Sequence, residues 1–162
     1  MPDLLAHALI AYALATLLAL KYDWLSPTYV TVAMAGAFVP DLAKAHLLVS
    51  STTVESLLGL PFDWFALHTA GGTLLSILVG VTVVERNERR RVAALLALGA
   101  ASHLVADALL LNASGRSYAV LWPLTQYHPP TPGLYLSTEP GPTIATAATA
   151  LLAWYVVRRR KR

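Results

Sequence analysis

The sequence contains no cysteine and few charged residues, and each shortage excludes a class of protein. Without cysteine the chain has neither disulfides nor thiolate metal ligands, so a metal would need histidine, carboxylate or backbone oxygen ligands. Charged residues make up 13% of the 162 residues, whereas a soluble domain usually carries about 25%. Hydrophobic residues make up 56%, and the mean hydropathy is +0.56. This composition predicts one all-α integral membrane domain.

Five apolar segments predict a bundle of about five transmembrane helices. A helix rises 1.5 Å per residue, and the hydrocarbon core needs about 20 residues. The third and fourth segments meet that length, the first and fifth are slightly short, and the second is the weakest because prolines bracket it. The first segment lacks the features of a signal peptide, so we expect a retained helix. The segments are residues 4–20, 28–39, 65–84, 92–111 and 143–157.

The distribution of basic residues predicts the orientation in the membrane. Ten of the twelve Lys and Arg residues lie at Lys21, in "ERNERRR" (85–91) and in the tail "RRRKR" (158–162). With five spans these places share one side, and positive charge stays in the cytoplasm. We therefore expect a multi-pass plasma-membrane protein with its N-terminus outside and its C-terminus in the cytoplasm. The tail is favoured as a stop-transfer anchor over a nucleic-acid patch, so no nucleic-acid partner is expected.

The two long connections are then expected on the outer side. Residues 40–64 include Thr52 and Glu55 at capping-box spacing, which predicts a short helix at the membrane interface. Residues 112–142 are rich in Pro, Gly, Tyr and Ser and predict an irregular loop with aromatic residues suited to the headgroup zone. A loop this long in a small protein is typical of a functional lid or binding loop.

The apolar fourth segment contains the stretch "SHLVAD", which brings an acid into a membrane helix. An acid at the centre of a membrane helix costs about 2.5–3.5 kcal/mol on the insertion scale. His103 and Asp107 are spaced i, i+4 and therefore share one helix face. The pair predicts a polar site, with a buried His–Asp hydrogen bond that locks helix packing as the alternative.

Other histidines and aspartates gather at the same predicted end of the bundle. Taken singly each has a simple explanation, such as snorkelling to the interface or capping a helix. Together they form the kind of His/Asp group that a metal site in a helix bundle requires, and we expect the ligands to converge in one cluster. The residues in question are His7, Asp41, His46, Asp63, His68 and His128, beside His103 and Asp107.

The motifs resemble the membrane-bound metal-dependent hydrolases, also described as LexA-binding, inner-membrane-associated hydrolases. His7 in "LLAHALIAYAL" matches an early histidine of that family, and Pro40–Asp41 matches the start of its "PDxDH" motif. "DWFALHTAGG" matches part of "HRGxTHS", "SHLVAD" matches "SHLxxD", and Trp122–Pro123 matches a later "WP". The resemblance spans residues 7 to about 124.

The chain departs from the family pattern in two motifs. Ala43 stands where "PDxDH" has its second acid, so the chain is expected to bind one metal where relatives bind two, or to have lost catalysis. Asp63, Trp64 and Thr69 replace the first histidine, the arginine and the serine of "HRGxTHS". His46 is a loosely aligned substitute for a missing ligand.

The resemblance implies a hydrolase with a divalent cation, zinc or alternatively manganese or iron. Asp41 or Asp63 would serve as general base. A site near the outer interface suits an ester or phosphoester of a lipid or lipid-linked substrate, so membrane lipids are the expected partners, and no protein partner is indicated. The implied ligands are His7, Asp41, His68, His103 and Asp107.

Two other function classes remain open at this point. The first is a non-catalytic membrane scaffold or regulatory protein that keeps a structural metal or a His–Asp packing lock. The second is a transporter or proton relay, because intramembrane His/Asp pairs also serve there. Short spans without inverted repeats argue against the transporter.

Overall fold

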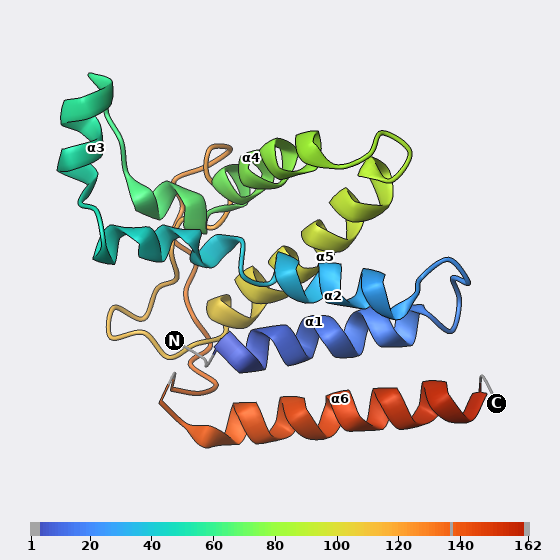
Figure 1. Ribbon diagram of the computed structural model, residues 1–162. Coiled ribbons are helices and arrows are strands. Elements are labelled where there is room, and N and C mark those ends of the chain that lie inside the picture. The colour runs from blue at the N-terminus through green and yellow to red at the C-terminus, as the bar shows by residue number, and fades with distance from the viewer. Residues whose placement is uncertain (1–3, 137, 161–162) are drawn as a thin grey trace.

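The computed structural model describes residues 4–136 and 138–160, and every regular element in them is a helix (Figure 1). The predicted all-α class is therefore confirmed for this part of the chain. The loop after α5 carries only two isolated β-bridges, Leu110–Tyr135 and Arg116–Pro130. The α-helices are α1 (Leu4–Leu18), α2 (Pro27–Gly36), α3 (Ser51–Leu58), α4 (Ala70–Gly80), α5 (Arg89–Ala108) and α6 (Pro140–Arg160), and the 3-10 helices are η1 (Pro40–Leu47), η2 (Trp64–His68) and η3 (Val81–Val83).

Two of these helices, α5 and α6, are long and apolar enough to cross a membrane, judged by length and composition. The helices α1 and α4 are apolar but shorter. The structure thus has a helical bundle with two helices of spanning length, where the sequence predicted about five. Residues 161–162 of the predicted basic tail lie outside the described residues.

Local breaks divide two of the predicted spans. The segment predicted at 28–39 is α-helical only to Gly36, and the 3-10 helix η1 begins at Pro40. Proline has no N–H for an α-helical bond and restricts the residue before it, so the helix ends ahead of it. The segment predicted at 65–84 is divided into η2, α4 and η3, because Thr69 caps α4 by accepting a hydrogen bond from Gly72 N.

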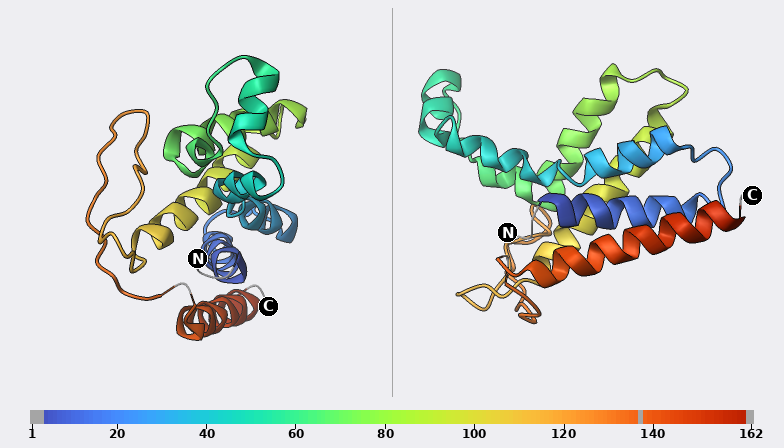
Figure 2. Two further views of the ribbon diagram at one scale, coloured as in Figure 1. Left: turned by 90° about the vertical axis from the view of Figure 1, so that its left-hand side faces the viewer. Right: turned by 60° about the horizontal axis from the view of Figure 1, so that its bottom comes forward.

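Small residues build the core around α1. This helix packs against α2, α5 and α6, which surround it (Figure 2). Its buried side chains are mostly alanines, so neighbouring backbones approach closely, as is typical of membrane helix interfaces. The buried alanines of α1 are Ala6, Ala8, Ala11, Ala13 and Ala15.

The crossing of α2 and α5 depends on two glycines. A Cβ atom on Gly36 would lie 2.3 Å from the carbonyl oxygen of Leu96, and one on Gly99 would lie 2.0 Å from that of Ala33. Both distances are far below van der Waals contact with rigid backbone. Only glycine allows this approach, which fixes the position of α5 and therefore of its polar residues.

The outward faces of α4 and α6 are apolar. Leu75 on α4 and Leu151 on α6 are 61% and 67% exposed. A soluble protein rarely exposes contiguous apolar surface of this kind. These faces fit a bilayer as the surrounding medium.

Helix α3 stands away from the bundle (Figure 1). The short helix was predicted here, but its capping residue was wrong: Ser50 Oγ accepts from Thr53 N, and Glu55 accepts from Phe62 N instead. Leu57, at 78% exposure, and Leu58 leave an apolar edge without intramolecular cover.

The basic connections gather at one end of the bundle. The turn between α1 and α2, the connection between α4 and α5 and the end of α6 lie together, while α3 and the 112–142 loop lie at the other end (Figures 1 and 2). At the basic end, the hydroxyl of Tyr29 on α2 donates to Glu88 just before α5. The fold therefore separates a basic end from the end that carries the histidines.

Candidate metal centre

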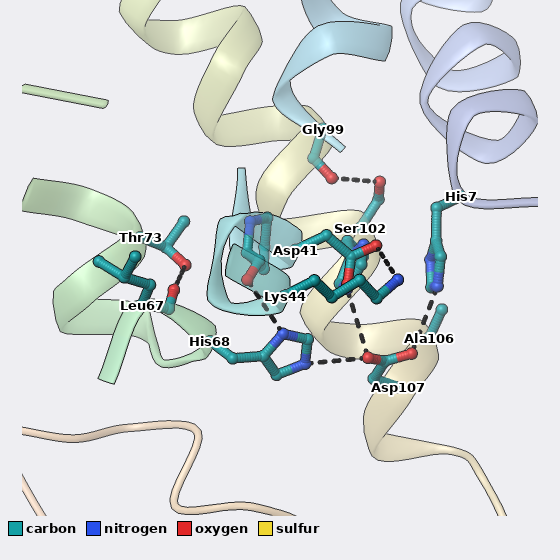
Figure 3. A network of polar contacts seen from close by, with 12 residues as sticks. His7, Asp41, Lys44, Leu67, His68, Thr73, Gly99, Ser102, Ala106 and Asp107 are labelled. Atoms are coloured by element: carbon teal, nitrogen blue, oxygen red, sulfur yellow. Dashed lines mark hydrogen bonds and ion pairs between the residues drawn. The ribbon is translucent and has the colours of Figure 1, made fainter. Parts of the chain in front are cut away.

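Four segments of the chain bring five buried polar side chains together, and Figure 3 labels four of them, His7, Asp41, His68 and Asp107. α1 supplies His7, η1 supplies Asp41, η2 supplies His68, and α5 supplies His103 and Asp107. All five are at most 9% exposed. These are the five residues predicted as ligands, and the structure brings every one of them into the group.

Asp107 is the centre of the group. Its Oδ2 atom lies 3.0 Å from His68 Nε2 and 3.3 Å from His103 Nε2. Its Oδ1 atom lies 3.3 Å from His7 Nε2. Three imidazoles from three segments thus direct the same ring nitrogen toward one carboxylate.

A backbone carbonyl fixes the orientation of His68. Its Nδ1 lies 3.2 Å from the oxygen of Pro40, and because a carbonyl only accepts, Nδ1 is the donor. The lone pair of the neutral ring is then on Nε2, the atom that faces Asp107. Metal-binding histidines are commonly held in this way.

The other two rings stack on each other. His7 and His103 have ring centroids 3.8 Å apart and planes inclined by 22°. Within the described residues, Nδ1 of both rings and Nε2 of His103 are buried without a hydrogen-bond partner. Buried polar atoms are seldom left in this state, so each of these nitrogens needs an explanation.

Asp41 completes the group from the side of η1. Its Oδ2 accepts from Lys44 Nζ at 2.8 Å, while its Oδ1 lies 4.0 Å from His103 Nε2. Within the described chain, Oδ1 of Asp41 and Oδ1 of Asp107 are buried and have no hydrogen-bond donor. The group therefore presents carboxylate oxygens as well as imidazole nitrogens that are unpaired.

The donor set fits a divalent cation. Ligand atoms about 2.1 Å from one tetrahedral ion lie roughly 3.4 Å from each other, close to the 3.0 to 3.3 Å that separate the three Nε2 atoms from the Asp107 carboxylate. Two sets of three residues, His7–His103–Asp107 and Asp41–His68–His103, each have ligand atoms within 4.8 Å of one another. A cation among them would also give a partner to Nε2 of His103 and to the unpaired Oδ1 atoms of Asp41 and Asp107, whereas the Nδ1 atoms of His7 and His103 point away from it. Nitrogen and carboxylate oxygen ligands suit zinc, and also manganese or iron.

Three other candidates from the sequence lie outside this group. Asp63 is exposed and caps η2, where its Oδ1 accepts from Phe65 N. His46 bonds to the oxygen of Ala43 and packs against Phe65, and His128 bonds to the oxygen of Ser117. Each of the three has a local structural role. Of the two residues predicted as general base, Asp41 and Asp63, Asp41 lies in the group and Asp63 does not.

Sequence reasoning missed several residues that border the group. Lys44 pairs with Asp41, and the ring of Tyr118 packs edge-on against His68 with centroids 5.5 Å apart. Tyr135 donates its hydroxyl to the oxygen of Ala106, next to Asp107; burial, followed by the charge of Asp107, raises the pKa of this phenol. The i, i+3 spacing of Asp41 and Lys44 could have indicated their contact from the sequence. No sequence pattern indicated the positions of the two loop tyrosines.

The loop predicted at 112–142 ends in the structure where α6 begins at Pro140, and it is attached to α4 and to the end of α5. Ala70 N and Gly71 N donate to the oxygens of Val120 and Trp122, so "WP" meets the start of α4. Leu111 N donates to the oxygen of Tyr135, and Leu134 N donates to that of Leu109 at the end of α5. The loop thus covers the end of the bundle next to His68 and Asp107.

A separate cavity of about 420 Å³ lies between α1, α2 and α6. Its lining includes Tyr12, Met34 and Trp154, with Arg158 at the basic end, and none of the five clustered residues. Its apolar walls match lipid or the packing of helices rather than hydrolytic chemistry. The metal centre is therefore a distinct place in the fold.

A family model described as YdjM inner membrane protein matches residues 1–162, the whole length of the chain. Comparisons with curated proteins and with solved structures gave no match. The family description agrees with the apolar composition, the lipid-suited faces of α4 and α6 and the expected plasma-membrane location. The chain therefore belongs to the YdjM inner membrane protein family.

Proposed function

We propose that this protein is a metal-dependent hydrolase embedded in the membrane. The observation that carries the proposal is the convergence of three histidine Nε2 atoms and two carboxylates, all buried, from four separate segments. Burying two carboxylates whose Oδ1 atoms have no hydrogen-bond partner in the described chain is costly, and a structural lock would need only one His–Asp pair. The group has more unpaired nitrogen and oxygen ligand atoms than a packing lock needs, which favours a metal centre.

The clustered residues divide the chemical work between them. His7, His68, His103 and Asp107 hold the cation. Asp41 is the general base, because its Oδ1 is directed at the group without a hydrogen-bond partner in the described chain. A bound divalent cation lowers the pKa of its water to about 7 and polarises an ester or phosphoester oxygen.

The location of the centre supports a lipid or lipid-linked substrate. It lies at the end of the bundle opposite the basic connections, next to the 112–142 loop (Figure 1). In the proposed topology α1, the α2–η1 unit, α4, α5 and α6 all cross the bilayer, and the C-terminus lies in the cytoplasm. The centre then opens at the outer face, where a head group meets it while its tails stay in the bilayer.

The test is the metal content of the full chain, purified in mild detergent without chelator. We expect about one zinc, manganese or iron ion per chain in the wild type. His103→Ala and Asp107→Ala should reduce the metal content, and His46→Ala is the matched control because His46 lies outside the group. A wild type without metal would overturn the proposal.

Activity then separates catalysis from a structural metal. The metal-loaded protein should hydrolyse p-nitrophenyl phosphate or p-nitrophenyl acetate, and chelation should stop the reaction. Bound metal with no turnover of either ester would identify a scaffold with a structural metal instead.

A further inference from the structure

We propose that Lys44 is a substrate-binding residue that makes this centre select a phosphate ester over a neutral ester. The inference rests on the hydrolase function proposed above and names its substrate class. It starts from a residue that the family motifs do not include, at the edge of the group (Figure 3).

The 3-10 geometry of η1 places Lys44 beside Asp41. With three residues per turn, positions i and i+3 lie directly above each other, so Asp41 and Lys44 share a face of Pro40–Leu47. Their side chains meet at 2.8 Å between Nζ and Oδ2. The same geometry turns Ala43, which is buried, to another side of the helix.

Lys44 is the part of this contact that reaches solvent. Its side chain is 28% exposed, whereas that of Asp41 is 7% exposed. An ammonium group has three donors, and within the described residues Lys44 directs one of them at Asp41. The remaining donors are available to a ligand that enters from the exposed side.

The charges of the centre favour an anion. Metal-bound histidines are neutral, so Asp41 and Asp107 balance the two charges of the cation. Lys44 then gives the loaded centre a net charge of one positive unit. A phosphate ester gains from this charge and from hydrogen bonds to the ammonium, whereas a carboxylic ester carries no charge to be attracted.

Ala43 makes the role of Lys44 more specific. The resemblance places the second acid of "PDxDH" at this position, and an alanine cannot hold a second cation. Lys44 supplies a fixed positive charge next to Asp41 instead. The site then has one metal ion and one ammonium to attract a phosphate group.

The test measures phosphate binding and metal content on the full chain in detergent. Titration calorimetry with inorganic phosphate is done on the zinc-loaded wild type, Lys44→Met, Lys44→Arg and the remote control Lys21→Met, whose parent ammonium lies over the Tyr22 ring. We expect Lys44→Met to keep its zinc and to raise the phosphate Kd about tenfold to a hundredfold, the range of one charged hydrogen bond. Lys44→Arg should restore most of the affinity, and Lys21→Met should match the wild type.

Esters supply a second readout. Lys44→Met should lower kcat/KM for p-nitrophenyl phosphate about as much as it weakens phosphate binding, and by a larger factor than it lowers kcat/KM for p-nitrophenyl acetate. A short-chain phosphatidate that binds more tightly than inorganic phosphate would assign the phosphate to a lipid head group, and equal Kd values would assign it to a soluble ester.

Two results would overturn the inference and one would overturn the function beneath it. An unchanged phosphate Kd in Lys44→Met, with zinc bound, would show that Lys44 contacts only Asp41. Loss of zinc from Lys44→Met would show that Lys44 supports the structure of the metal centre instead of binding phosphate. A wild type that binds no metal would overturn the hydrolase proposal and this inference together.

Discussion

The Nε2 atom of His68 lies 3.0 Å from Oδ2 of Asp107, although 39 positions separate the two residues. This contact joins η2 to the last turn of α5, and the bond from His68 Nδ1 to Pro40 joins the same ring to η1. One imidazole thus connects three segments. The geometry of the centre therefore depends on how these segments pack, and changes in packing and in ligands should have separable effects.

Asp107→Asn should remove the metal and destabilise the protein. The amide keeps the size of the side chain but loses the charge and one acceptor that face three histidine nitrogens. Leaving buried groups unpaired costs about 1–3 kcal/mol. Metal analysis and thermal unfolding in detergent measure both effects. Asp63→Asn is the matched control, since asparagine also caps helices, and equal metal loss in both variants would contradict the assignment.

Chelation should lower the Tm of the wild type. A ligand that binds only the folded state at 100 times its Kd stabilises by about 2.7 kcal/mol, and removal of the metal reverses this. The Tm of Asp107→Asn should not respond to chelator, because its centre is expected to be empty already. The same Tm for the wild type with and without chelator would argue that no cation supports the fold.

Gly99→Ala should disrupt the bundle without touching a ligand. The added Cβ would lie 2.0 Å from the oxygen of Ala33 and 2.7 Å from Ala37 N, both backbone atoms of the α2 segment. The two helices must separate. This displaces His103, which lies one turn after Gly99 on α5. Thermal unfolding and size-exclusion chromatography should show a large loss of stability.

Gly80→Ala is the control for this substitution. A Cβ at Gly80 meets no heavy atom within 4 Å, and alanine is favoured over glycine in helices by about 1 kcal/mol. Its Tm should equal or exceed that of the wild type. Similar behaviour of the two alanine variants would mean that α2 and α5 do not cross as closely as the structure has them.

Gly71→Ala should detach the 112–142 loop while leaving the metal bound. Its Cβ would lie 2.3 Å from Pro123 Cδ and 2.7 Å from the oxygen of Trp122. Trypsin has one cleavage site within this loop, at the exposed Arg116, so detachment should accelerate cleavage there. An unchanged cleavage rate would show that "WP" does not hold the loop against α4.

The site was easier to predict from the sequence than the helix boundaries. The i, i+4 spacing of His103 and Asp107 follows from helix geometry alone, and the order of the motifs indicated the partners His7, Asp41 and His68. Lys44 was missed although its i, i+3 spacing from Asp41 was visible in "PDLAKAH", and the structure shows that η1 places the two side chains in contact. The tyrosines of the loop approach the site through long-range folding, which no local pattern encodes.

The ends of the helices differ from the predicted segments for a local physical reason. Hydropathy averages over a window, whereas a helix ends at individual residues such as Pro40 or the capping Thr69. The cap of α3 was assigned to Thr52 for a similar reason: the spacing with Glu55 was correct for a capping box, but Ser50 lies at the actual start. Hydropathy therefore found the apolar segments, and individual prolines and capping side chains determined their ends.

Introduced cysteines should decide between five membrane crossings and two. Because the chain has no cysteine, one added thiol is the only target for a membrane-impermeant maleimide on intact cells. With five crossings the 40–64 connection is outside, so Ser56→Cys on α3 should be labelled. If only α5 and α6 cross, that connection is in the cytoplasm and Ser56→Cys should react only after the cells are opened.

Two control positions should each give the same result whether the chain crosses the membrane five times or twice. Leu124 lies in the loop between α5 and α6, and its side chain is 90% exposed. Leu124→Cys should therefore be labelled from outside. Asn87→Cys, in the basic connection before α5, should be protected until lysis. Labelling of Asn87→Cys on intact cells would reverse the orientation and would place the metal centre on the cytoplasmic face, where its substrate would have to be found.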